Sequence, residues 1–400
     1  MTGLLEQKCI MIIAGEASGD LHGSHLVKAM RKKDQSLFFC GIGGQALKDA
    51  GTKILFDASR LAVVGITEVF SKIPDLLKGM TTAKRVLKTL RPDLLILIDF
   101  PDFNFHIAAA AKKIGIPVLY YISPQVWAWR SGRSKKIKKL VDHMAVILPF
   151  EEDYYKAHKI PATFVGHPLL DSEFFRSKNF SHACFPVDKA LEKEVKDFNV
   201  IGLLPGSRDK EILRHLPEMI GAANILSKRK KNIKFIISVA PSAERSLVEG
   251  VLKRFQRQAA FEFVSGGVDK VLERCDLVIA ASGTVTLEAG IFGTPMIIVY
   301  KMSPVSYWLG RAMIEVKNVG LVNLIAGEEI VPELLQDDVN PENIVAKVFE
   351  MLNDPAGLEA IRKKLLGIRD LLGGPGASER VAYIAMKLMV GDRQAMGYGL

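Results

Sequence analysis

Apolar runs of strand length recur along the first half of the chain and alternate with amphipathic helical patterns. In each run the apolar residues occupy consecutive positions, which is typical of strands that are buried on both faces of a parallel sheet. The runs span residues 9–14, 36–42, 94–98, 117–122, 145–148 and 163–165. This alternation predicts an open parallel sheet with helices on both faces.

The pattern breaks at residues 171–198 and then starts again. That segment is polar and irregular, and we expect a linker with a short helix there. Strand-like runs follow at 200–204, 235–239, 261–264, 277–280 and 296–300. After about residue 341 the pattern is wholly helical. The second half is therefore expected to form another doubly wound sheet, followed by a helical C-terminus.

Together these patterns predict an α/β protein with two Rossmann-like, doubly wound parallel-sheet domains in tandem. Because ligands of such sheets bind at the carboxyl ends of the strands, we expect an active-site cleft between the domains. The C-terminal helix is expected to pack on the first domain or on a partner subunit. The predicted divisions are domain 1–170, linker 171–198, domain 199–372, and C-terminal helix and tail 373–400.

The composition narrows the class of protein. Of the 400 residues, 48% are hydrophobic and 24% charged, which is enough apolar material for full-sized cores. The formal charge of +10 indicates an anionic partner, and nucleotides, nucleic acids and anionic lipids all remain open. The four cysteines lack the spacing of a disulfide framework or a zinc site. With no recognisable secretory signal or membrane span, we expect a cytoplasmic protein, soluble or peripheral on a membrane.

Two loops of the first half carry candidate chemistry. Residues 15–20 (GEASGD) follow the first strand, and here Ser18 can donate a hydrogen bond and Asp20 can cap the next helix. A purely structural turn is almost equally well supported. Asp99 directly follows the strand 94–98, where a carboxylate facing a cleft suits a general base. Asp102 is expected instead to cap the next helix, and a metal held by these two acids is weakly supported.

Two other stretches fit either a packed core or a surface. Trp127 and Trp129 adjoin six basic residues within 130–139, which suits single-stranded nucleic acid, a membrane interface or an ordinary solvated helix. An apolar stripe at helical spacing is normally core, but if exposed it would contact membrane or acyl chains. The stripe comprises Ile66, Val69, Phe70, Ile73, Leu76, Leu77 and Met80.

In the second half, residues 201–211 indicate a strand, a tight turn and a helix. Gly206 lies in the turn and Ser207 is expected to cap the helix. A helix N-terminus attracts anions, and Arg208 would add a planar cation that suits phosphate. An ordinary turn with a surface arginine is equally well supported by this stretch alone.

A second strand-to-helix turn lies at residues 281–290. Ser282, Gly283 and Thr284 open a helix where backbone N–H groups and hydroxyls suit a phosphate. Glu288 lies about one turn deeper on the same helix face, where it could accept both hydroxyls of a ribose. The alternative is a buried glutamate paired with a lysine such as Lys301.

Taken together, these motifs resemble those of the lipid-A-disaccharide synthases, glycosyltransferases of lipopolysaccharide assembly. The resemblance runs in consistent order from about residue 8 to residue 372, and its most specific part is the tryptophan motif at 123–129. The matching stretches are 14–20 (AGEASGD), 98–104 (IDFPDFN), 123–129 (SPQVWAW), 148–151 (LPFE), 165–167 (VGH), 203–208 (LLPGSR) and 281–284 (ASGT) with Glu288.

The resemblance implies a GT-B fold and an inverting reaction. UDP-2,3-diacylglucosamine would be joined to 2,3-diacylglucosamine 1-phosphate through a β-1,6 bond, with release of UDP. Asp99 is implied as the base and Arg208 as the group that meets the diphosphate, facing each other across the cleft. The other implied substrate and UDP contacts are Ser18, Asp20, Gly206, Ser207, Ser282, Gly283, Thr284, Glu288 and Asn323.

The same resemblance implies partners and a location. Both substrates carry acyl chains, which favours an exposed apolar stripe and a protein that is cytoplasmic and peripheral on the inner membrane. No cofactor, metal or nucleic acid is implied, and a homodimer stays open. The alternative enzyme is another UDP-sugar GT-B protein such as a UDP-N-acetylglucosamine epimerase, although the first-half motifs favour the lipid acceptor. A nucleic-acid-binding protein would leave Asp99 and Glu288 without a role.

Overall fold

The structure is a computed structural model of the chain. It describes residues 7–61, 66–127, 132–172, 199–240, 243–255, 259–302 and 318–391, without the side chains of residues 60 and 66–72. The chain forms two compact units. Unit 1 comprises Met1–Asn179 together with Leu372–Leu400, and unit 2 comprises Phe180–Leu371.

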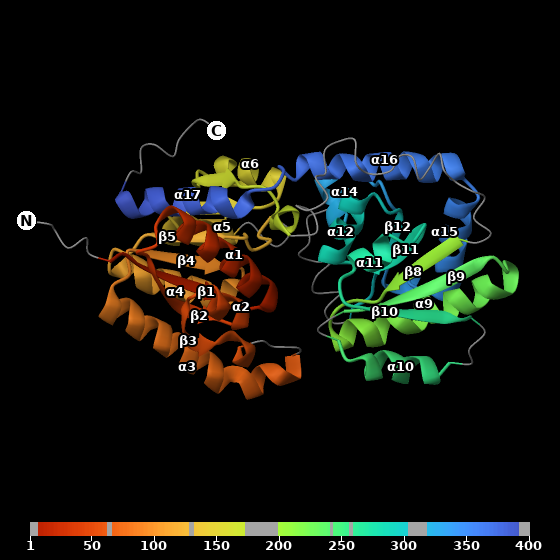
Figure 1. The fold of residues 1–400 in the computed structure, drawn as a ribbon, viewed down its shortest axis with the longest axis horizontal. Coiled ribbons are helices and arrows are strands. Elements are labelled where there is room, and N and C mark those ends of the chain that lie inside the picture. Colours follow the sequence, from red (N-terminus) through yellow and green to blue (C-terminus); the bar gives the residue numbers. More distant parts are fainter. Residues whose placement is uncertain are drawn as a thin grey trace, which may run out of the picture. The chain divides into compact units, whose positions relative to one another are not determined.

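Unit 1 contains a parallel sheet of seven strands in the order β3-β2-β1-β4-β5-β6-β7 (Figure 1). The strand order reverses between β1 and β4, which pair in parallel from Ile10 opposite Leu94 to Ala14 opposite Ile98. The strands are β1 (Cys9–Ala14), β2 (Phe38–Gly43), β3 (Lys53–Asp57), β4 (Leu94–Ile98), β5 (Val118–Tyr121), β6 (His143–Val146) and β7 (Ala162–Phe164).

Helices cover both faces of this sheet because alternate residues of each buried strand point to opposite sides. Ile10 and Ile12 pack in one core with α1 and α17, whereas Met11 and Ile13 pack in another with α3, α4, α5 and α6. The helices are α1 (Ala17–Lys33), α2 (Gln45–Asp49), α3 (Ile66–Leu90), α4 (Pro101–Lys113), α5 (Gly132–Leu140), α6 (Pro149–Ala157) and α17 (Ala377–Val390).

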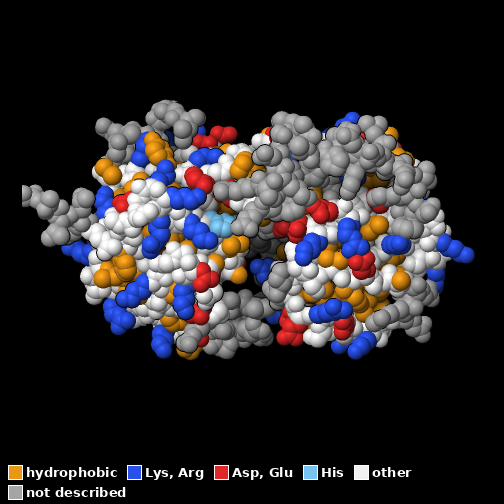
Figure 2. All heavy atoms as spheres, viewed as in Figure 1, with side chains coloured by type: hydrophobic (Ala, Val, Ile, Leu, Met, Phe, Trp, Pro, Cys, Tyr) orange, Lys and Arg blue, Asp and Glu red, His pale blue; other side chains and the backbone are white. Residues whose placement is uncertain are grey.

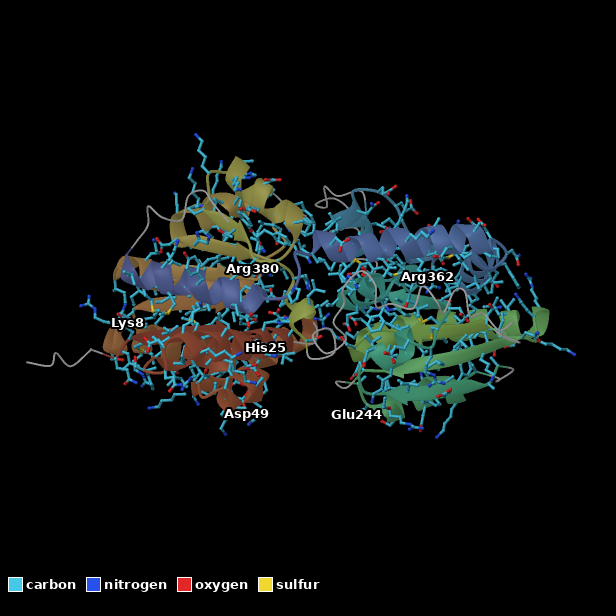
Figure 3. All side chains as sticks on the ribbon, turned by 45° about the horizontal axis from the view of Figure 1, so that its top comes forward. Lys8, His25, Asp49, Glu244, Arg362 and Arg380 are labelled. Carbon is cyan, nitrogen blue, oxygen red and sulfur yellow. The ribbon has the colours of Figure 1, made fainter. Side chains whose placement is uncertain are left out.

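The C-terminal helix α17 packs in unit 1, beside α1. The carboxylate of Asp171 accepts hydrogen bonds from the backbone N–H groups of Gly376 (2.6 Å) and Ser378 (3.0 Å), at the start of the helix. Arg380 Nε donates to the carbonyl of Val165 at 2.7 Å (Figure 3). A buried acid and an arginine therefore attach the last helix to the 165–171 segment of the same unit.

Unit 2 repeats the architecture with six parallel strands in the order β10-β9-β8-β11-β12-β13. The order reverses between β8 and β11, and α9, α10 and α15 share a core with the sheet. The strands are β8 (Asn199–Leu204), β9 (Ile233–Val239), β10 (Phe261–Ser265), β11 (Leu277–Ala281), β12 (Met296–Tyr300) and β13 (Glu333–Leu335). The helices are α9 (Asp209–Arg229), α10 (Arg245–Lys253), α11 (Asp269–Leu272), α12 (Thr284–Phe292), α14 (Leu321–Ala326), α15 (Pro341–Leu352) and α16 (Pro355–Leu371).

The predicted fold class is confirmed: the chain has two doubly wound, parallel α/β sheets and a helical C-terminus. Each strand run that the sequence indicated forms a strand at that place. Two strands, β3 and β13, carry no clear signal in the sequence. Both lie at an edge of their sheet, so they are only partly covered and lack the continuous apolar run of a central strand.

Candidate functional site

The candidate residues of unit 1 gather where its strand order reverses. In open α/β sheets, ligands bind outside the carboxyl ends of the strands at such a reversal. Since Ala14 pairs with Ile98, the loops after β1 and β4 leave the sheet side by side. The first loop leads to Ser18, which is exposed in the first turn of α1, and the second begins with Asp99.

The backbone turns sharply at Asp99. Asp99 and Phe100 have φ angles of +46° and +51°, and for residues other than glycine such a conformation costs on the order of 1–3 kcal/mol each. Phe100, not Asp102, is the N-cap of α4, so the predicted cap at Asp102 is wrong. Pro101 starts the helix, which leaves Asp102 in its first turn, 87% exposed and 3.4 Å from Arg133. Asp99 therefore lies outside the helix.

The ring of Phe100 connects the two loops of unit 1. A Cβ atom built on Gly15 would lie 2.3 Å from this ring, so only glycine fits at that position. Phe100 also packs against Phe103, with 5.3 Å between the ring centroids. The glycine of the first loop thus accommodates the strained turn of the second.

Asp20 has a structural role in unit 1. Its buried carboxylate accepts hydrogen bonds from the N–H groups of Gly44 (2.6 Å), Ala46 (2.9 Å) and Leu47 (3.3 Å), at the start of α2. It therefore caps α2, which is remote in sequence, as an acid at a helix N-terminus does. The predicted cap at Asp20 for the next helix is wrong, because Asp20 lies in the first turn of α1 and Glu16 is the N-cap of that helix. Contact of Asp20 with a substrate stays a prediction.

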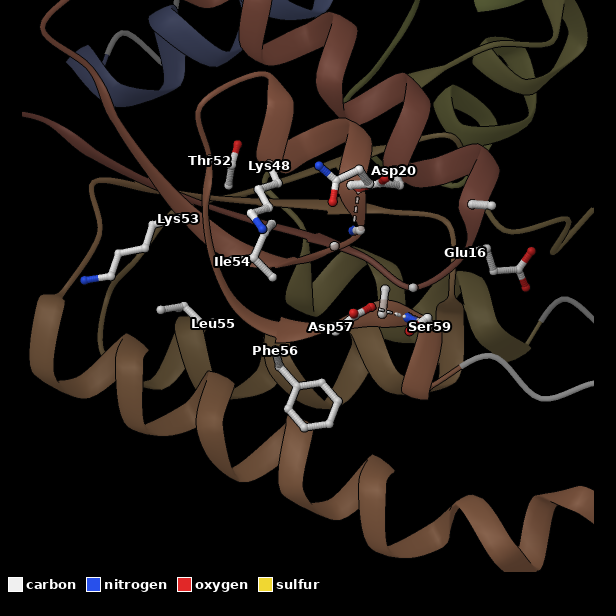
Figure 4. Close-up of a pocket in the computed structure, with 16 residues that line it drawn as sticks. Glu16, Asp20, Lys48, Thr52, Lys53, Ile54, Leu55, Phe56, Asp57 and Ser59 are labelled. Atoms are coloured by element: carbon white, nitrogen blue, oxygen red, sulfur yellow. Dashed lines mark hydrogen bonds between the residues drawn. The ribbon is translucent and has the colours of Figure 1, made fainter.

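A cavity of about 890 Å³ lies beside Asp20 and extends from the carboxyl ends of β1 and β2 along the whole of β3 (Figure 4). It is lined by residues 15–17, 43–45 and 52–59, together with Asp20 and Lys48. The lining includes glycine backbone, the cations Lys48 and Lys53, and the acids Glu16 and Asp57, so it suits a polar ligand with charged groups. Lys53 lies on β3, an element that the sequence did not indicate.

Glu151 anchors the tryptophan motif, a role that the sequence did not reveal. Its Oε1 accepts a hydrogen bond from Trp127 Nε1 at 3.0 Å, and its Oε2 accepts from the N–H groups of Ile147 and Leu148. Trp127 also packs edge-on against Phe150, with 4.9 Å between the ring centroids. The two motifs of the resemblance at 123–129 and 148–151 therefore meet in space. Trp129 lies outside the described residues.

Burial raises the pKa of Glu151 to about 7, although the hydrogen bonds from Leu148, Trp127 and Ile147 oppose the shift. The folded protein therefore holds a proton here that the unfolded chain releases above its ordinary pKa of 4.5. This proton contributes to the free energy of unfolding. The contribution is fully present below pH 4.5 and is lost as the pH rises through about 7, a loss of about 3 kcal/mol in total.

Glu151→Gln is expected to remove this pH dependence because glutamine does not ionise. The free energy of unfolding of the wild type minus that of the variant should fall between pH 4.5 and 8. Urea denaturation at several pH values measures this difference in the free energy of unfolding. The pH-dependent contributions of the buried histidines His22, His143 and His167 are the same in both proteins and cancel. A difference that stays constant across this range would contradict the assignment.

The exposed side chains of α3 and α5 in unit 1 bear on the predicted contact with a membrane. On α3, Ile73 and Leu77 are 40% and 59% exposed, whereas Leu76 packs partly against the core. The side chains of Ile66, Val69 and Phe70 lie outside the described residues. On α5, Ser134 and Ile137 are buried and four lysines are exposed. None of the helices in the described part of the chain combines the length and the apolar character that crossing a bilayer requires.

In unit 2 the candidate loops again flank the strand reversal. Leu204 of β8 pairs with Ala280 of β11, so the loops carrying Arg208 and Ser282 leave the sheet side by side. Both lead directly into helices, α9 and α12. Unit 2 therefore presents two helix N-termini at one edge, an arrangement that suits an anionic ligand.

The turn before α9 is organised by Glu211. This carboxylate accepts hydrogen bonds from the N–H groups of Ser207 (3.0 Å) and Arg208 (3.3 Å), and it pairs with the Arg208 guanidinium at 2.9 Å. Arg208 is the N-cap of α9, so the predicted cap at Ser207 is wrong: Glu211 supplies the cap from inside the helix. Gly206 has φ +119°, and a Cβ there would lie 2.5 Å from Glu211. The Arg208 side chain remains 63% exposed and accessible to a ligand.

His215 stabilises the loop before α9, a role that nothing in the sequence pattern indicated. The buried imidazole makes a hydrogen bond between Nδ1 and the carbonyl of Pro205 at 3.1 Å, and its Nε2 accepts from the N–H of Lys301 at 3.0 Å. Burial lowers the pKa of His215, which keeps it neutral. Lys301 pairs with Glu218 at 2.7 Å, and among the described contacts it makes no ion pair with Glu288.

The start of α12 is open. Gly283 and Thr284 are exposed, no side chain caps the helix, and a Cβ on Gly283 would meet no atom within 4 Å. Ser282 donates its backbone N–H to Val299 at 3.0 Å, which fixes the loop to β12. Burial, with a smaller contribution from Asp269, raises the pKa of Glu288 to about 7. The uncapped N–H groups and a nearby acid together suit a phosphorylated nucleoside.

Asn323 is fully buried and its side chain is engaged within unit 2. Its Nδ2 donates to the carbonyl of Val331 and to Glu333 Oε1, and its Oδ1 accepts from the N–H groups of Ile330 and Val331. These bonds fold the 330–333 segment back on α14. The structure gives Asn323 this internal role, and contact with a nucleotide stays a prediction.

Two more features bear on the type of ligand. On the face drawn in Figure 2, Lys and Arg side chains are spread over both units among acidic and apolar ones, without one continuous basic stripe. Within the described ranges, no group of three or more His, Cys, Asp or Glu side chains is arranged to hold a metal ion.

Several solved structures share the fold of this chain. UDP-GlcNAc 2-epimerase from Neisseria meningitidis, bound to UDP-GlcNAc, matches with a TM-score of 0.63 at 13% identity, over 95% of this chain and 100% of that one. MurG of Acinetobacter baumannii matches with a TM-score of 0.59 at 15% identity, over 95% and 99%. At these identities the likeness shows the fold alone, and it confirms the expected GT-B class.

Sequence relatives are much closer. A family model described as lipid-A-disaccharide synthetase matches residues 10–382. The lipid-A-disaccharide synthase of Syntrophus aciditrophicus (strain SB) is 44% identical over 386 residues, which are 96% of this chain and 99% of that protein. That of Geobacter metallireducens is 44% identical over 390 residues, covering 97% and 99%. The match extends over both units and all the motifs described above, and the chain therefore belongs to the lipid-A-disaccharide synthetase family of glycosyltransferases.

Proposed function

We propose that this enzyme condenses UDP-2,3-diacylglucosamine with 2,3-diacylglucosamine 1-phosphate, giving the β-1,6-linked disaccharide 1-phosphate and UDP with inversion at the anomeric carbon. Family membership supports the lipid A disaccharide product. The observation that carries the residue assignment is the position of Asp99, Arg208 and the open α12 N-terminus, each at a strand reversal of its sheet.

In this proposal Asp99 is the general base. The 6-hydroxyl of the acceptor attacks the anomeric carbon and transfers its proton to the Asp99 carboxylate, while the bond from that carbon to the UDP oxygen breaks. A single displacement of this kind inverts the configuration and needs only one base. Asp99 suits the role because it directly follows a buried strand and lies outside the following helix.

Unit 2 is assigned to the donor nucleotide. The uncapped N–H groups at Gly283 and Thr284 would bind the diphosphate, and Glu288, one turn deeper, would accept the ribose hydroxyls. Arg208 would stabilise the negative charge that develops on the leaving UDP. Its ion pair with Glu211 lies at the surface, so exchanging this partner for a phosphate costs little.

The assay that tests the proposal supplies both lipid substrates to the purified enzyme and identifies the products by mass spectrometry. Disaccharide 1-phosphate and UDP are expected in equal amounts, and the anomeric proton coupling of the product should indicate a β linkage. The control is the same reaction with the UDP-linked donor and without the acceptor. No disaccharide would refute the proposal, and conversion of UDP-N-acetylglucosamine without acceptor would indicate an epimerase.

We also propose that unit 1 docks on the cytoplasmic face of the inner membrane through α3 and α5. The exposed side chains Ile73 and Leu77 would enter the lipid interface, and the lysines of α5 would meet anionic head groups. The double variant Ile73→Ser/Leu77→Ser is expected to co-sediment several-fold less with phosphatidylglycerol-containing vesicles at high salt. Leu213→Ser, at an exposed leucine of unit 2, is the matched control. Equal binding of the two variants would rule out docking through α3.

A further inference from the structure

The backbone carbonyl of Asp99 is held by two side chains. Tyr120 Oη donates a hydrogen bond to this oxygen at 2.6 Å, and Asn104 Nδ2 donates to the same oxygen. Asn104 Nδ2 also approaches the carbonyl of Ile98, at 3.3 Å. A carbonyl oxygen has two lone pairs, so these two donors satisfy it completely.

The two donors come from different elements and both are fully buried. Tyr120 lies on β5, the strand beside β4, whereas Asn104 lies in the first turns of α4. The position of the Asp99 carbonyl is thus determined from the neighbouring strand and from the following helix at once. Burial, and then the negative charge of Asp99, raises the pKa of Tyr120 well above its usual range. The hydroxyl therefore remains a donor throughout the pH range of an assay.

These bonds act on a backbone that would otherwise relax. Asp99 and Phe100 both have positive φ angles, a conformation that persists only where the surroundings impose it. The direction of the Cα–Cβ bond of Asp99, from which its carboxylate extends, follows from the backbone angles. If the carbonyl were released, the turn would relax toward ordinary angles and the carboxylate would point elsewhere.

We propose that Tyr120 and Asn104 are positioning residues, which hold the Asp99 carboxylate in the orientation that accepts the acceptor's hydroxyl proton. The inference rests on the proposed function, because it takes Asp99 as the base. Neither residue gains or loses a proton: the proton moves from the hydroxyl oxygen to Asp99 as the new carbon–oxygen bond forms and UDP departs with the bonding electrons.

Tyr120→Phe tests the inference because it removes one oxygen atom and keeps the ring. We expect kcat to fall by roughly 10–100-fold, since a small misplacement of a reacting group has an effect of this size. The KM values for both substrates should change by less than about threefold, because substrate binding does not depend on the direction of the Asp99 carboxylate.

Tyr121→Phe is the matched control. Tyr121 is the next residue of β5, is equally buried, and packs on the opposite face of the sheet with α1 and α17. It loses the same oxygen atom without contacting the Asp99 carbonyl, so its kcat should stay close to that of the wild type. Thermal unfolding of both variants identifies any loss of kcat that comes from unfolding.

Asn104→Leu supplies a second test with a side chain of nearly the same size. Leucine cannot donate, so kcat should again fall with little change in KM. Combined with Tyr120→Phe, its effect should be less than the product of the two single effects, because both residues act on one carbonyl. In the single variants, the acidic limb of the kcat–pH profile should shift, since the environment of the base changes.

The outcomes separate this inference from the proposed function. If Tyr120→Phe retains the kcat of Tyr121→Phe, or loses only substrate affinity, the positioning role is refuted while Asp99 can still be the base. If Asp99→Asn keeps full activity, the proposed function of Asp99 fails first. Reduced kcat together with an unchanged pH profile in both Tyr120→Phe and Asn104→Leu would also overturn the positioning role.

Discussion

Replacing Asp99 by asparagine is expected to lower kcat for disaccharide formation by roughly 10³-fold, within the range that general base catalysis contributes. Asparagine has nearly the same shape and tolerates a positive φ as well as aspartate does. The bonds from Tyr120 and Asn104 end on the backbone carbonyl, so the turn should be kept. The variant therefore loses the proton acceptor and little else, and the KM values should change only slightly.

The matched control is Asp102→Asn in the same loop. Asp102 is 87% exposed and lies 3.4 Å from Arg133 at the surface, an arrangement that contributes little. Its effect on kcat should be at least tenfold smaller than that of Asp99→Asn. Steady-state kinetics with both lipid substrates, together with circular dichroism of each variant, make the comparison. Activity of Asp99→Asn within tenfold of the wild type would remove this residue from the proposed chemistry.

Arg208→Ala is expected to lower kcat/KM by roughly 10²–10³-fold, the usual loss when one group that stabilises developing charge is removed. The diphosphate gains charge as the sugar departs, so most of the loss should appear in kcat. Arg208→Lys should recover only part of the activity because lysine lacks the planar fork that binds two phosphate oxygens. The fold should be kept, since the Glu211 bonds to the backbone of the turn do not involve the guanidinium.

Lys210→Ala is the control for the loss of a positive charge. Lys210 is an exposed cation in the first turn of the same helix, so a general electrostatic effect would appear in both variants. Raising the salt concentration distinguishes them further, because screening weakens long-range attraction but not a direct contact. A similar, salt-sensitive loss in both variants would show that Arg208 acts only through its charge.

The tertiary structure revised several roles that the motifs had suggested. Asp102 and Ser207 are helix caps by sequence pattern, yet Phe100 and Arg208 take the N-cap positions. A cap depends on where the helix begins, and neighbouring residues such as Pro101 and Glu211 shift this point. The boundary of an element is less well determined by pattern than its existence.

Long-range partners explain the residues that the sequence did not reveal. Glu151 is 24 residues from Trp127, and the N–H of Lys301 donates to an imidazole 86 residues away, that of His215. Tyr120 reaches the Asp99 carbonyl from a different strand. None of these pairs has a characteristic spacing, because contact depends on which strands become neighbours in the sheet.

The two doubly wound sheets, the strands at which the candidate loops begin, and the family could all be predicted from the amino-acid sequence. These features rest on local information: continuous apolar runs, turn residues and motifs with fixed spacing. How the loops are held became visible in the folded structure. It brought Phe100 onto Gly15, engaged Asp20 in capping α2, and placed two buried donors on the carbonyl of Asp99. The physical reason is that hydrogen bonds and packing between remote segments depend on strand order, which a local pattern does not record.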